Sequence, residues 1–172
     1  MKSLIRITMA IAVLAPLAVM TAAPAGAANS VSCTASAGTA TIKPGITPTA
    51  TNVTITVKET LTKCSGGGIT SGSETASILS KGANCAGLAK KGTKTGPIKG
   101  TITWSNKKTS SVSLTTVSNG LAATATGSVT AGLFAGKKIS TAIIYSLKTG
   151  TCTAKSPLTA LTIKGTKPFT IS

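Results

Sequence analysis

From residue 33 onward, apolar and polar residues alternate in short runs, and this pattern predicts β-strands. β-branched residues recur at every second position, Thr and Ser fill many positions between them, and Gly, Asn or Pro separate the runs. No window sustains the apolar spacing of an amphipathic helix. We expect strands at 33–42, 52–63, 70–80, 97–105, 109–118, 121–131, 137–147 and 158–171, and one short helical turn within 84–94.

Short turns between consecutive strands predict antiparallel hairpins, and the register of each hairpin follows from matching its apolar faces. The pairings expected in this way are Val57 opposite Ala76, Ile102 opposite Val112, and Val129 opposite Ile139. Consecutive hairpins form a meander. The fold class is therefore all-β, an antiparallel meander of about eight strands that forms a small barrel or sandwich.

The first residues have the organisation of a cleavable secretory signal. Lys2 and Arg6 supply a positive start, residues 7–20 are almost wholly apolar, and an Ala-Gly-Ala motif ends at residue 27. The apolar stretch is shorter than the ~20 residues needed to span a bilayer. We expect a signal peptide at 1–27 and a single secreted β domain at 28–172, with no membrane span after cleavage.

Four cysteines in a small exported chain predict two disulfides. No close pair suggests a zinc site with four thiolates, because no two of these cysteines have the Cys-x-x-Cys spacing. In an alternating meander, Cys33 and Cys64 lie at one end, and Cys85 and Cys152 lie at the other. Bonded cysteines need Cα atoms about 4.4–6.8 Å apart. We therefore expect the pairs Cys33–Cys64 and Cys85–Cys152.

The turns and cysteines together resemble those of a group of short, Thr- and Gly-rich exported proteins of actinobacteria. The features shared are Cys33, the turn Cys64-Ser65-Gly66-Gly67-Gly68, Asn84-Cys85, the turn Gly132-Leu133-Phe134-Ala135-Gly136, and Cys152. The resemblance implies export and a β architecture. That group has no characterised activity or functional residues to carry over, and the Lys content here departs from its near-neutral pattern.

Charge limits the chemistry that the domain can perform. Beyond residue 27 there are 16 lysines and two glutamates, with no His, Asp or Arg, so the net charge is +14. Catalysis and metal binding through imidazole are excluded, and calcium loops lack their clustered carboxylates. We expect no metal and no cofactor. Nucleic acid is not an expected partner, because Arg is absent and only four aromatic residues remain.

The densest run of positive charge surrounds Cys85 and is the candidate site for an anionic partner. It consists of Lys81, Lys90, Lys91, Lys94 and Lys99. A cell-wall polymer or an acidic headgroup fits an exported protein better than nucleic acid does. The alternative is that these lysines only solubilise a β protein and discourage association between strand edges.

The two carboxylates form a second candidate site. In the expected register, Glu59 lies directly opposite Glu74 on the core-facing side, where like charges repel. Three arrangements are open. The strand ends can flare so that each carboxylate reaches water or a lysine such as Lys63. The two groups can share a proton, or they can act as acid and nucleophile on a glycoside.

The expected function is a non-enzymatic structural or binding domain of the cell envelope or extracellular space, contacting anionic wall polymer through Lys. One alternative is a secreted inhibitor or toxin-like module that binds another protein. The other is a carbohydrate-active enzyme that uses Glu59 and Glu74. The sequence carries no signal for the oligomeric state.

Overall fold

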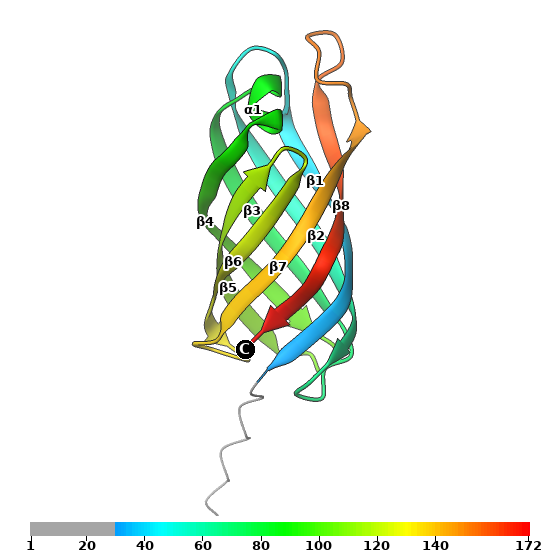
Figure 1. Ribbon diagram of the computed structural model, residues 1–172, viewed down its shortest axis with the longest axis vertical. Coiled ribbons are helices and arrows are strands. Elements are labelled where there is room, and N and C mark those ends of the chain that lie inside the picture. The colour runs from blue at the N-terminus through cyan, green and yellow to red at the C-terminus, as the bar shows by residue number, and fades with distance from the viewer. Residues whose placement is uncertain (1–29) are drawn as a thin grey trace, which may run out of the picture.

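A computed structural model describes residues 30–172, so the expected signal peptide at 1–27 lies outside the described part of the chain. Eight antiparallel strands close into a barrel, and one short helix lies at one end (Figure 1). The elements are β1 (Val31–Ile46), β2 (Thr51–Ser65), β3 (Gly72–Ala83), α1 (Cys85–Ala89), β4 (Lys91–Trp104), β5 (Thr109–Asn119), β6 (Ala122–Gly132), β7 (Lys138–Thr149) and β8 (Leu158–Ile171).

Alternation of side chains across the wall explains why these segments are strands. In β2, Val53 and Leu61 are fully buried, while Thr54, Thr56 and Thr60 face solvent. Successive residues of a strand point to opposite faces, so this pattern sends the aliphatic set inward and the hydroxyl set outward. The wall is therefore apolar inside and covered with Thr, Ser and Lys outside.

Pairing between β1 and β8 closes the sheet and decides for the barrel over the sandwich. Val31 is opposite Ile171 and Ala40 is opposite Leu161. Figure 1 shows the beginning of β1 beside the end of β8, at what we call the lower end; α1 marks the upper end. Closure removes the two edges that an open meander would expose.

The first hairpin has the register expected from the sequence, with Val57 opposite Ala76. The other two are displaced by two residues, so those expectations were wrong. Ile102 is opposite Ser110, because the turn centres on Asn106, whose side chain accepts a hydrogen bond from the Lys108 N–H.

In the third hairpin, Ile139 is opposite Gly127 instead of Val129. The turn is displaced because Phe134, at a φ of 65°, turns inward and is only 3% exposed. Its ring meets Trp104 edge-on, with the centroids 5.6 Å apart. A displacement of two residues keeps every side chain on its expected face.

The interior consists of two apolar clusters. The lower cluster contains the large aromatics Trp104, Phe134 and Phe169, packed with residues such as Leu61 and Ile102. The upper cluster contains only aliphatic residues in its fully buried part: Ala40, Ile42, Ile46, Val53, Ala123, Ile143, Leu158, Leu161 and Ile163. Val57 packs against both clusters, so it marks the level at which they meet.

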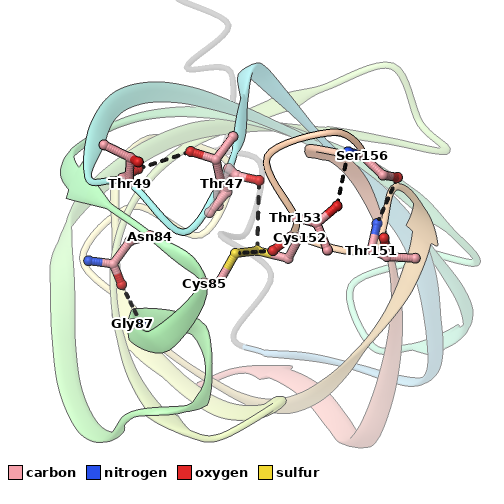
Figure 2. The surroundings of a disulfide bond; sticks show 10 residues. Thr47, Thr49, Asn84, Cys85, Gly87, Thr151, Cys152, Thr153 and Ser156 are labelled. Atoms are coloured by element: carbon pink, nitrogen blue, oxygen red, sulfur yellow. Dashed lines mark hydrogen bonds between the residues drawn. A yellow bond between two sulfur atoms is a disulfide. The ribbon is translucent and has the colours of Figure 1, made fainter.

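Both disulfides form as expected, one at each end of the barrel. Cys33–Cys64 joins β1 to β2 at the lower end, where the two residues are also partners in the ladder. Cys85–Cys152 crosses the upper mouth, from the start of α1 to the loop between β7 and β8 (Figure 2). Two disulfides are typical of an oxidising, extracellular-type compartment.

Candidate functional site

The carboxylate pair lies inside the barrel wall. Glu59 of β2 is directly opposite Glu74 of β3, and the two residues are only 9% and 5% exposed. Glu59 follows Val57 along the inner face, so the pair lies where the two apolar clusters meet. The expectation that flared strands would bring both groups to water or to a lysine was wrong, because the strands continue in register on both sides.

A glycine brings the neighbouring backbone against Glu59. Gly38 of β1 is the ladder partner of Glu59. A Cβ at Gly38 would lie 2.7 Å from the Glu59 Cα, closer than real Cβ contacts allow. Any larger residue at Gly38 would push β1 away from β2 and would open the wall beside the carboxylates.

Two further polar side chains face the pair, Ser36 and Tyr145. Burial raises the pKa of Glu59, and the nearby Ser36 hydroxyl lowers it in part. Ser36 Oγ and Glu59 Oε1 are both buried without a hydrogen-bonding partner. Burial, and then the charge of Glu59, raises the pKa of Tyr145 from 10.0 to about 12. These four groups form a polar layer where the two apolar clusters meet.

Burial and mutual repulsion favour the protonated form of the pair. Burial is the main cause that raises the pKa of Glu59 above its ordinary value. Burial, followed by the negative charge of Glu59, raises the pKa of Glu74 from 4.5 to about 7. A protonated carboxyl can donate to its neighbour. The burial of both groups therefore favours protonation of at least one of them near neutral pH, as the second arrangement requires.

The lysines lie on the outside of the barrel, in contrast to the two buried carboxylates. Fifteen of the 16 lysines within residues 30–172 are exposed, and Lys137 is half-buried. Both carboxylate side chains of the described chain point inward. Lysine is therefore the only charged side chain on the outer surface of this part of the molecule. The expected partner Lys63 is exposed at the lower end of β2.

The structure brings four of the five candidate lysines to the upper end. Lys81 is near the end of β3, Lys90 caps α1, and Lys91 and Lys94 lie at the beginning of β4. Three lysines distant in sequence also lie at this end, on β1, on β7 and in the loop after β7: Lys43, Lys148 and Lys155. The sequence run around Cys85 did not reveal them, although the alternating direction of the strands could have.

Lys99 lies lower, in a groove on the outer wall. The groove has a volume of about 660 Å³ and crosses strands β2 to β6. Besides Lys99, the outward-facing residues that line it all carry hydroxyl groups: Thr56, Thr75, Ser77, Thr101, Ser111, Ser113 and Thr130. A surface of hydroxyls around one cation can form hydrogen bonds to sugar hydroxyls or to phosphate oxygens.

The upper mouth is covered by α1 and by the loop between β7 and β8. Asn84 caps α1 by accepting a hydrogen bond from the Gly87 N–H, and the Cys85 N–H donates to the Thr47 carbonyl (Figure 2). Leu88, Cys85 and Cys152 pack against the upper cluster. The disulfide therefore holds a cover over the aliphatic half of the interior.

Comparisons of this chain with protein families, curated proteins and solved structures found no match. Within residues 30–172, no group of three or more His, Cys, Asp or Glu side chains could hold a metal ion. No helix in that range is long and apolar enough to cross a membrane.

Proposed function

We propose that this protein is an exported, non-enzymatic binding domain of the cell envelope or extracellular space, which contacts anionic wall polymer through its lysines. One observation carries the proposal: within residues 30–172, lysine is the only charged side chain on the outer wall, while both carboxylates lie inside. Such a surface attracts polyanions from every direction, because no acidic side chain on it opposes the attraction.

The hydroxyl-lined groove supports a polymer of sugars and phosphates as the ligand. Lys99 supplies a cation at the groove, and the threonines and serines around it supply donors and acceptors. The two carboxylates are inside the barrel and do not line this groove. This separation supports binding rather than glycoside hydrolysis, because a polymer bound in the groove would not reach the two carboxylates.

The test is binding to isolated, phosphate-bearing wall polymer at about 0.01 M and about 1 M salt, where the screening length falls from about 30 Å to about 3 Å. We expect binding at low salt that weakens at least about tenfold at high salt. Lys99→Gln should weaken binding more than Lys107→Gln, which removes the same charge from the turn between β4 and β5. Absence of binding at low salt, or equal effects of the two variants, would contradict the proposal.

One observation favours the protein-binding alternative. The loop from Gly150 to Pro157 is held at its base by Cys85–Cys152 and is ordered internally, since Thr151 and Thr153 N–H groups both donate to the Ser156 carbonyl. A rigid loop loses little conformational entropy when it binds another protein. Its binding would depend on contact rather than on long-range charge, so affinity that persists at about 1 M salt would favour this alternative.

A further inference from the structure

The ladder between β3 and β4 covers only half of these strands. Residues Gly72–Ser77 pair with Lys99–Trp104, and the pairing ends there. Above this point, β3 continues to pair with β2 through Ala83, and β4 continues to pair with β5 back to Lys91. Within the described chain, the upper halves of β3 and β4 thus form no ladder with each other, and each presents an edge of backbone N–H and C=O groups.

Pro97 explains why the ladder stops. Extended by two residues, the register from Ser77 and Lys99 would place Leu79 opposite Pro97, which has no N–H to donate. Outward-facing side chains on both edges are exposed. Between Lys91 and Pro97 only Thr95 is even half-buried, and Leu79 of β3 is 63% exposed.

The charges around this opening have one sign. Lys81 lies on the β3 side, Lys91 and Lys94 lie on the β4 side, and Lys99 lies where the ladder begins. A row of unpaired backbone groups is a template for an added strand, and exposed apolar side chains beside it supply contact for alternate residues of that strand. The opening therefore combines backbone hydrogen-bonding capacity, an apolar anchor at Leu79, and positive charge.

We infer that the opening between the upper halves of β3 and β4 receives an extended acidic peptide by β-strand addition. Acidic side chains on the outer face of the peptide would meet the lysines, an apolar residue on the same face would contact Leu79, and the peptide backbone would bond to the two free edges. A second copy of this chain fits poorly, because the lysines of two copies would repel each other across the same edge. This inference goes beyond polymer binding, because it requires backbone hydrogen bonds as well as charge.

The experiment uses the oxidised protein and two six-residue peptides that carry Glu, Val and Glu at the alternate positions of one face, with Thr between them. One has an ordinary backbone, and the other carries N-methyl groups on alternate amides, which keep its charge but remove the hydrogen-bond donors along one of its two edges. We expect the ordinary peptide to bind at least about tenfold more tightly and to slow amide exchange within 78–83 and 91–96. Equal affinity of the two peptides would overturn the inference and would reduce the contact to electrostatics alone.

Two matched variants locate the site. Lys91→Gln with Lys94→Gln removes two charges beside the opening, and Lys107→Gln with Lys108→Gln removes two charges from an exposed turn at the lower end. We expect only the first pair to weaken binding of the ordinary peptide, by about tenfold. Equal weakening by both pairs, or exchange protection at a different strand, would also overturn the inference. Wall-polymer binding is measured separately, so its outcome does not decide this one.

Discussion

The two halves of the barrel differ in the composition of their cores and in the pairing of β3 with β4. The lower half has a continuous ladder between β3 and β4, and its core contains both Phe residues and the single Trp. The upper half has a smaller aliphatic core, an unpaired opening between β3 and β4, and a cover held by a disulfide. We interpret the lower half as the source of stability and the upper half as the region left available for binding.

Removing the aromatic anchor of the lower half should have the largest effect. Trp104 is 1% exposed, and its indole N–H donates to Ser110 Oγ at 2.8 Å. Trp104→Ala should destabilise the protein by about 3–5 kcal/mol, since it leaves a cavity and removes the hydrogen bond that the Ser110 hydroxyl accepts. Chemical denaturation would measure the loss. A loss below about 1 kcal/mol would show that the lower half is not the main source of stability.

Removing the upper disulfide should have the next largest effect. The Cys85–Cys152 bond closes a loop with a sequence separation of 67, and Cys85→Ser with Cys152→Ser should cost about 3 kcal/mol. Because the bond holds the cover, amide exchange should accelerate most in α1 and in the upper strand ends. Uniform acceleration through both halves would contradict the division of the barrel that we describe.

The parts predicted from sequence are those that depend on local alternation. The order of the strands, their inward faces and the disulfide pairs follow from the period of two and from the alternating direction of strands. Closure was not predictable, because the contact between Val31 and Ile171 depends on residues at opposite ends of the domain. Alternation cannot distinguish a register from one displaced by two residues. At Asn106 and Phe134, therefore, turn chemistry decided the pairing.

Local alternation predicts the candidate sites only in part as well. Parity placed Glu59 opposite Glu74, but whether water reaches them depends on closure and on the close approach of Gly38. The opening between β3 and β4 had a local signal in Pro97, which is unfavourable in a central strand. The groove around Lys99 had no such signal, since hydroxyl residues cover the whole outer wall.

The carboxylate pair at the junction of the two halves should give a smaller, pH-dependent effect. The folded-state pKa of Glu74 is about 7, above the ordinary value of 4.5. Folding therefore favours the protonated form. This contribution is fully present below the unfolded pKa and is lost as the pH rises through about 7. Glu74→Gln should stabilise the protein by about 1–2 kcal/mol at pH values above that range and should have little effect in acid.

Thermal melts of Glu74→Gln and the parent protein, in acid and in mildly alkaline buffer, would test this sign. Glu59→Gln is the matched comparison, because it removes the other charge of the pair. If Glu74→Gln destabilises the protein in alkaline buffer, the carboxylate has a stabilising partner and the pair does not share a proton.

The smallest expected effect compares lysines at the two ends. Lys91→Gln with Lys94→Gln relieves repulsion at the upper end, where seven lysines lie, and should stabilise the protein by a few tenths of a kcal/mol at low salt. Lys107→Gln with Lys108→Gln should change stability less. The change in stability of each double variant should vanish at about 1 M salt, where screening removes the repulsion between lysines. Melting temperatures at low and high salt measure them. A loss of stability in the upper variant would mean that Lys91 and Lys94 make stabilising contacts within the barrel, and would count against an upper end kept free for a partner.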